Sequence, residues 1–192
     1  MQEIAPGLHR WTAWHDHWEE DVGSLAVDTE DGLVFIDPLE PPPTLGEPAH
    51  ALITVYWHTR STQAPRVWAH KRAAKMVSNR GAEVTDPFHP GDHLPGGIEA
   101  FATARPGEVV YWLPQHRALA VGDVLLGAGA KPRATDDPLR LCPERWLGKA
   151  THADLRASLA PLLDLPVEHV LVSHGAPVVG GGRDALAAAL TQ

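Results

Sequence analysis

The chain has 192 residues, 44% of them hydrophobic and 21% charged, and this length fits one domain or at most two small ones. Such an ordinary globular composition excludes a disordered chain, a fibrous protein and a disulfide-stapled miniprotein. Sixteen lysines and arginines against 24 aspartates and glutamates give a formal net charge of -8, which argues against nucleic acid and anionic membrane surfaces as partners.

The cysteine content and the N-terminal segment indicate the cellular compartment in which the protein is expected. Cys142 is the only cysteine, so neither an internal disulfide nor a cysteine-rich zinc site can form. The first residues contain no basic segment followed by an apolar one, and no apolar run approaches the roughly 18 residues that a membrane span needs. We therefore expect a cytoplasmic protein that is neither secreted nor inserted into a membrane.

The first half of the chain predicts mostly strands. An antiparallel meander is expected over residues 8–14, 24–28 and 32–37, with a hairpin turn at Glu30-Asp31-Gly32. After a proline-rich break, the apolar segment 51–57 predicts an interior strand that is covered on both faces. A short strand over 66–69, a helix over 70–80 and extended backbone over 82–85 follow.

The second half predicts a hairpin and then helices. Apolar strands are expected over 107–113 and 118–126, on either side of a polar turn. Thr151 is a credible N-cap, with Asp154 three residues later, for a helix that carries leucines on one face. A last strand over 167–172 and a last helix over 184–190 complete the chain. Because strands come in two groups, each followed by helices, this order favours a layered α/β sandwich with mixed sheets, and residues 1–192 are predicted to form one domain.

Three polar residues stand at or near the ends of strongly apolar predicted strands. They are His58, Asp123 and His174. Strand ends that share one edge of a sandwich can bring such side chains together, and two histidines with an aspartate suit a divalent transition metal such as zinc. The alternative for each residue taken singly is a hydrogen-bonded strand-end side chain, which is the commoner situation.

An ordered set of short motifs resembles the metallo-β-lactamase fold superfamily over nearly the whole chain. In family order, the matching segments are Val22-Gly23-Ser24-Leu25, Leu33-Val34-Phe35-Ile36-Asp37-Pro38, His58 at the start of the ligand loop, 106–114, Ala120-Val121-Gly122-Asp123 and Val172-Ser173-His174-Gly175. The resemblance implies a four-layer αββα sandwich with two mixed β-sheets. It also implies a hydrolase of the thioester, lactam, lactone or phosphoester class that uses zinc or iron.

The departures from the family pattern bear directly on function. At the positions of the other ligands of the first loop stand Arg60, Thr62 and Gln63, and Ala104 stands at the position of the central histidine. Only His58, Asp123 and His174 remain of the ligand set that the resemblance implies.

Two functional hypotheses follow from this incomplete ligand set. In the first, the protein is a hydrolase with at most one metal ion, zinc, iron or manganese, held by His58, Asp123 and His174, while Arg60 binds an anionic part of the substrate or stabilises an oxyanion. In the second, a bidentate pair between Arg60 and Asp123 replaces the ion, and the cleft binds a small molecule or a protein partner without catalysis. The lost ligands favour the metal-free interpretation over a single weakly bound metal.

Two further segments are candidates for the mouth of this cleft. His15 and His17 would share one strand face by their spacing of two residues. Residues 139–146 follow Asp123 closely and would cover the pocket with Arg140, Arg145 and Trp146, while Cys142 is expected to be a buried small hydrophobe.

Overall fold

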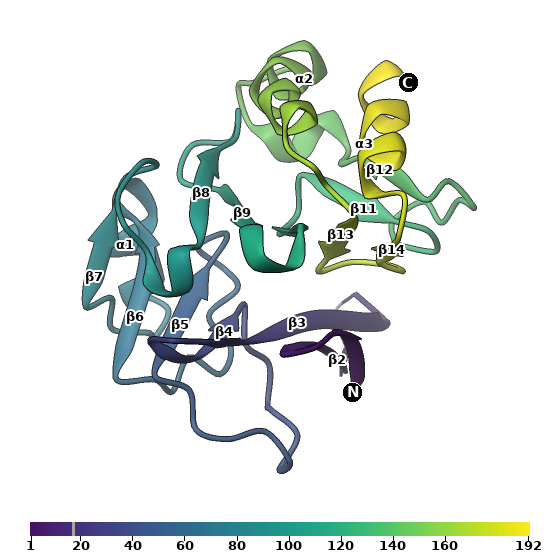
Figure 1. Cartoon of the computed structure of the whole chain (residues 1–192). Helices are drawn as coiled ribbons and strands as arrows, with labels where there is room; N and C mark the ends of the chain where they lie inside the picture. The colour runs from purple at the N-terminus through teal and green to yellow at the C-terminus, as the bar shows by residue number, and fades with distance from the viewer. Residues whose placement is uncertain (17) are drawn as a thin grey trace.

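Two β-sheets packed against each other form the centre of the molecule (Figure 1). The computed structural model describes residues 1–16 and 18–192. The first sheet has seven strands in chain order. They are β1 (Gln2–Ala5), β2 (Leu8–His15), β3 (Glu20–Thr29), β4 (Gly32–Ile36), β5 (His50–Ile53), β6 (Arg66–His70) and β7 (Asp86–Phe88). The pairs from β1 to β4 are antiparallel and those from β4 to β7 parallel, so the sheet is mixed, as predicted.

The second sheet has five strands in the order β14-β13-β10-β9-β8. They are β8 (Glu99–Ala102), β9 (Val109–Leu113), β10 (Ala118–Val121), β13 (His169–Val172) and β14 (Val178–Val179). Only the pair between β10 and β13 is parallel, so this sheet is mixed as well. A separate two-stranded ribbon pairs β11 (Leu125–Gly127) with β12 (Leu139–Leu141).

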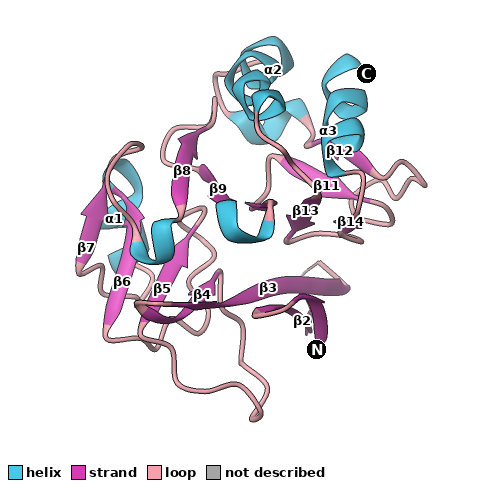
Figure 2. Cartoon of the chain, in the orientation of Figure 1, coloured by secondary structure: helices cyan, strands magenta, loops and turns pink. Residues whose placement is uncertain are grey.

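Helices cover the outer faces of both sheets, as the helix colouring of Figure 2 makes clear. The α-helices are α1 (Lys71–Ser78), α2 (His152–Leu159) and α3 (Gly182–Thr191), and the 3-10 helices are η1 (Pro95–Gly97), η2 (Pro114–His116), η3 (Glu144–Leu147) and η4 (Ala160–Asp164). At the start of α2, Thr151 and Asp154 exchange side-chain and backbone hydrogen bonds in a capping box, which confirms the predicted N-cap. None of the helices in the described parts of the chain has the length and apolar character that a membrane span requires.

Three layers of apolar side chains separate these four layers of structure. One cluster joins α1 to the seven-stranded sheet through Val67, Ala73 and Val77. A second lies between the two sheets and includes Leu52 and the fully buried Tyr111, whose hydroxyl donates to the Ile53 carbonyl. The third packs the five-stranded sheet against α2 and α3. The predicted four-layer αββα arrangement is therefore observed.

Three strand predictions need correction. The strand expected over 51–57 ends at Ile53, because the backbone N–H of Thr54 donates to Asp37 Oδ1 at 2.8 Å and a turn follows. The segment 118–126 is divided into β10 and β11, because the N–H groups of Asp123 and Val124 donate to the Glu108 carboxylate rather than to a strand. The extended segment expected over 82–85 has no strand, and β7 begins only at Asp86.

Candidate metal centre

His58, Asp123 and His174 lie together where strands of both sheets end. One ligand atom from each lies within 4.8 Å of the other two, and all three residues are buried. His58 follows β5 in the first sheet, whereas Asp123 and His174 stand two residues beyond β10 and β13 in the second. The carboxyl ends of parallel strands share one edge of a sheet, and the parallel register of Val121 with Val172 therefore brings Asp123 and His174 to the same edge.

Close backbone approaches hold the two sheets together at this edge. The Gly23 N–H donates to the Ser173 carbonyl at 2.7 Å, which ties β3 to the segment that carries His174. A Cβ atom at Gly122 would lie 2.5 Å from Thr54 Oγ1. Gly175 has a φ of +83°, and its Cβ would lie 2.6 Å from the Gly127 carbonyl. Glycine is therefore required before Asp123 and after His174.

A carboxylate holds the Nδ1 atom of each histidine. His58 Nδ1 lies 2.8 Å from Asp37 Oδ2, and His174 Nδ1 lies 2.6 Å from Glu20 Oε1. Asp37 has a φ of +48°, an uncommon conformation for a residue other than glycine, and it sits directly after β4. With each Nδ1 engaged in this way, both imidazoles turn Nε2 toward Asp123.

The Nε2 atoms and Asp123 Oδ1 have the spacing of metal ligands. Oδ1 lies 3.1 Å from His58 Nε2 and 3.3 Å from His174 Nε2. Ligand atoms about 2.0–2.1 Å from a tetrahedral ion lie about 3.3 Å from one another. Although the distance to His58 is in hydrogen-bond range, neither His58 Nε2 nor Asp123 Oδ1 has an aligned hydrogen-bond partner among the described residues. Buried ligand atoms at this spacing and without aligned partners fit a single shared cation.

Electrostatics couples these side chains strongly. Burial by itself would lower the pKa of His58, but the carboxylates of Asp37 and Asp123 raise it to about 10. Burial would likewise raise the pKa of Asp123, yet His58 and His174 hold it well below its usual range. For His174, the hydrogen bonds with Asp123 and Glu20 outweigh burial and raise the pKa. A proton on either imidazole therefore competes with a metal ion for the same Nε2 lone pair.

A tryptophan and an arginine surround the other oxygen of Asp123. Trp57 Nε1 donates to Asp123 Oδ2 at 2.7 Å, and Arg105 Nη1 lies 3.9 Å from the same atom. The Arg105 guanidinium lies over the Trp57 ring, with 4.9 Å to the ring centroid, and donates to Glu108 Oε2 at 2.8 Å. Burial raises the pKa of Glu108 to about 7, with Arg105 acting in the opposite direction.

Arg60 does not form the pair with Asp123 that the metal-free hypothesis requires. Throughout residues 1–16 and 18–192, no ion pair or hydrogen bond joins the two side chains, and the arginine beside Asp123 is Arg105. Arg60 is instead an exposed residue that lines the neighbouring pocket. The expected bidentate pair is wrong because Trp57 and Arg105 already surround Oδ2.

A pocket of about 500 Å³ opens onto Asp123. Its walls combine three arginines, three tryptophans, a histidine and the aspartate: Arg60, Arg80, Arg105, Trp18, Trp57, Trp146, His15 and Asp123. Of the predicted covering segment 139–146, Trp146 lines this pocket, whereas Arg140, Arg145 and the fully buried Cys142 line a different one. The predicted burial of Cys142 is confirmed. His15 lines the pocket, and His17 is outside the described residues.

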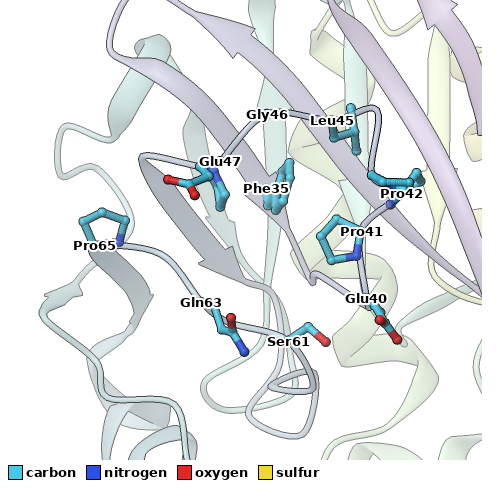
Figure 3. Close-up of a pocket in the computed structure, with 12 residues that line it drawn as sticks. Phe35, Glu40, Pro41, Pro42, Leu45, Gly46, Glu47, Ser61, Gln63 and Pro65 are labelled. Carbon is cyan, nitrogen blue, oxygen red and sulfur yellow. The ribbon is translucent and has the colours of Figure 1, made fainter.

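Beyond Arg60, the loop that follows His58 lines a different pocket from the one that contains Asp123. Ser61 and Gln63 line a second pocket, of about 560 Å³, between the proline-rich segment after β4 and this loop (Figure 3). Gln63 stands where the resemblance places a metal ligand, but it faces this pocket with Glu40 and Glu47. The second half of the ligand loop therefore contributes nothing to the centre around Asp123.

Sequence reasoning missed four residues that support the site. Asp37 had a recognisable signal, since it ends an apolar strand just before Pro38. Glu20 had no recognisable sequence signal, because its approach to His174 depends on how far the hairpin of β2 and β3 extends beyond β4. Arg105 and Glu108 belong to the turn before β9, and their contact with Asp123 appears only once β9 and β10 are paired.

Solved structures similar to this chain share its fold. A metallo-β-lactamase from Pontibacter korlensis is 16% identical with a TM-score of 0.71, and the match covers 100% of this chain and 98% of that one. A metallo-β-lactamase from Erythrobacter litoralis, with β-mercaptoethanol in its active site, is 16% identical with a TM-score of 0.71 over 99% and 93% of the two chains. The metallo-β-lactamase FIM-1 from Pseudomonas aeruginosa, in its mono-zinc form, is 16% identical with a TM-score of 0.68 over 98% and 92%.

Comparison with protein-family models gives no match, and comparison with curated proteins gives none either. The chain nevertheless has the metallo-β-lactamase fold over its whole length. The fold expected from the ordered motifs is confirmed. At this level of identity the fold says nothing about the substrate.

Proposed function

We propose that this protein is a metal-dependent hydrolase with one divalent ion, zinc, iron or manganese, held by His58, Asp123 and His174. The observation that carries the proposal is the spacing of 3.1 and 3.3 Å between Asp123 Oδ1 and the two Nε2 atoms, with each Nδ1 fixed by its own carboxylate. The FIM-1 neighbour is described in a mono-zinc form, which is consistent with a single ion in this fold.

The residues around the proposed ion have separate roles. A bound divalent ion supplies Lewis-acid polarisation of a substrate carbonyl or phosphoryl oxygen and lowers the pKa of water. Asp37 and Glu20 keep the imidazoles in the tautomer that leaves Nε2 free of a proton, and Trp57 orients Asp123. Arg60 and Arg105 place positive charge beside the reacting group, where negative charge develops during attack on a thioester, lactone or phosphoester.

A metal-free binding protein is the second candidate. It is favoured by the complementary charges at the centre, because the carboxylates of Asp37 and Asp123 raise the pKa of His58 to about 10 and would keep it protonated. Arg105, rather than Arg60, would then supply the remaining positive charge beside Asp123. Under this candidate, the old cleft binds a small molecule without turning it over.

Metal analysis of the full-length protein separates the two candidates. The protein is purified without chelator, dialysed against zinc, iron or manganese in turn and analysed by mass spectrometry. We expect one equivalent of metal in the parent protein and less than about a tenth of an equivalent in His58→Ala and His174→Ala, since each removes a ligand. The matched control is His93→Ala, an exposed histidine away from the site.

The loaded protein is then assayed on a panel of thioesters, lactones and phosphoesters. Hydrolysis that disappears with chelator and returns with metal supports the enzyme. A parent protein with no more metal than His58→Ala would overturn the metal site and leave the binding protein as the better description.

A further inference from the structure

The pocket beside Asp123 concentrates positive charge in an acidic protein. Arg60 follows the turn after β5, Arg80 follows α1 and Arg105 precedes β9, yet all three line the same cavity. The chain as a whole carries a formal net charge of -8, and among the described residues that line the pocket Asp123 is the only carboxylate. The lining therefore has the opposite sign of charge to the chain as a whole, and unlike the arginine-lined pocket around Arg140 and Arg145 it also contains three tryptophans.

The three guanidinium groups retain unused hydrogen-bonding capacity. Arg105 is only 6% exposed, and its Nε has no hydrogen-bond partner among the described residues. Across residues 1–16 and 18–192, neither Arg60 nor Arg80 takes part in an ion pair. Arg80 lies over the Tyr56 ring, 5.2 Å from its centroid, which holds the guanidinium without neutralising it. A buried donor without a partner favours an acceptor from outside the chain.

Three indole rings form a second part of the pocket wall. Trp18 and Trp146 meet edge to face with ring centroids 5.4 Å apart, and Trp57 carries the Arg105 guanidinium on its face. A volume of about 500 Å³ suits a small organic molecule. Tryptophan walls bind flat apolar groups well, because their large rings lose little conformational freedom on contact.

We propose that the pocket binds a small organic anion, with its carboxylate or phosphate group on Arg60, Arg80 and Arg105 and its planar apolar body against the tryptophans. The proposal deepens the proposed function, because it names the substrate class of the same site. The planar guanidinium groups match carboxylate and phosphate geometry. The anionic group would be held next to Asp123, so that the adjoining bond of the ligand faces the candidate metal centre.

Calorimetric titration of the full-length protein, first treated with chelator, tests the proposal without any metal. The probes are 1-naphthoate, 1-naphthyl phosphate, the neutral 1-naphthamide and inorganic phosphate. We expect both aromatic anions to bind at least about ten-fold more tightly than the amide and than inorganic phosphate, which lack the charge and the ring respectively.

Three variants locate the binding. Arg60→Gln and Arg80→Gln should each weaken 1-naphthoate binding about ten-fold, whereas Arg72→Gln, an exposed arginine on α1, should leave it unchanged. Circular dichroism checks that all three variants are folded. Equal affinity for naphthoate and naphthamide, or equal affinity in all three variants, would overturn the proposal.

Repeating the titration after zinc loading separates this proposal from the metal site. Anion binding that depends on zinc but not on Arg60 and Arg80 means that the ion alone holds the anion, which overturns the arginine pocket and keeps the metal centre. Anion binding that depends on the arginines in a protein that takes up no zinc overturns the metal centre and keeps the arginine pocket.

Discussion

At the scale of single residues, the centre depends on side chains that hold other side chains. Glu20 reaches His174 Nδ1 at 2.6 Å and also accepts the Lys131 backbone N–H at 2.9 Å. This arrangement fixes the ring orientation of His174 and makes its Nε2 a better electron donor. At the proposed metal site, Glu20 should therefore influence metal affinity although its carboxylate is on the far side of the imidazole.

Glu20→Gln is expected to lower zinc affinity by about ten-fold, because a neutral amide supports the histidine less well than a carboxylate. Competition with a chromogenic chelator measures the affinity of the folded protein. Glu19→Gln is the matched control, because the Glu19 carboxylate is exposed and pairs only with the exposed Lys131 ammonium among its described ion pairs. Equal zinc affinity in the two variants would contradict the role given to Glu20.

Glu108 is a second supporting residue, and it acts on stability. It is 1% exposed, and its carboxylate accepts the backbone N–H groups of Asp123 and Val124 and one guanidinium N–H of Arg105. Glu108→Ala leaves three buried donors without an acceptor, so we expect a loss of at least about 3 kcal/mol in the free energy of unfolding.

Urea unfolding followed by circular dichroism measures this loss. Glu108→Gln should cost less, because its amide oxygen can still accept the two backbone N–H groups. Glu99→Ala, at an exposed position of β8, should change the free energy of unfolding by less than about 0.5 kcal/mol. A Glu108→Ala protein as stable as Glu99→Ala would show that the three hydrogen bonds contribute nothing.

At the scale of secondary-structure elements, local signals decide where structure begins. The capping box of α2 is the clearest case, because Thr151 and Asp154 satisfy backbone N–H groups that the first helical turn leaves unpaired. Thr151→Ala should cost about 1 kcal/mol, which corresponds to a melting temperature about 2–4 °C lower. Differential scanning calorimetry measures the shift, and Thr151→Ser should restore most of it. A Thr151→Ser protein that melts as early as Thr151→Ala would refute the capping contribution.

Whether the deciding interaction is local or distant in sequence explains which parts of the fold could be predicted. The hairpins of β2 to β4 and of β9 to β10 follow from alternating apolar residues and local turn signals, so they were predicted correctly. The apolar residues 54–57 also suggest a strand, but the backbone at Thr54 bonds to Asp37, 17 residues earlier, and no local pattern reports that contact. Prediction succeeded where the deciding interaction is close in sequence.

The candidate site follows the same rule. His58, Asp123 and His174 could be selected because each lies at or near the end of an apolar segment. Their surroundings could not, since Arg105 meets Asp123 only through the pairing of β9 with β10. A pair between Arg60 and Asp123 was expected because Arg60 replaces a ligand of the family pattern. The position of a residue in a motif, however, does not specify where its flexible side chain points.

At the scale of the whole molecule, the candidate centre connects the two sheets. His58 belongs to the loop after β5 in the seven-stranded sheet, whereas Asp123 and His174 follow strands of the five-stranded sheet. The Gly23–Ser173 backbone hydrogen bond crosses between the sheets close to His174. An ion shared by these three ligands would therefore stabilise the packing of one half of the sandwich on the other.

This arrangement predicts how metal affects unfolding. Zinc at about 100 times its dissociation constant should add about 2.7 kcal/mol to the free energy of unfolding, which raises the melting temperature by about 5–10 °C. Because the ligands come from both sheets, and because we expect residues 1–192 to behave as one domain, the thermogram should keep a single transition that moves as a whole. His174→Ala should lose the shift, and His93→Ala should retain it. A thermogram in which zinc moves only one of two transitions would instead place the ion within one half of the sandwich, and the centre that joins His58 to Asp123 and His174 would be wrong.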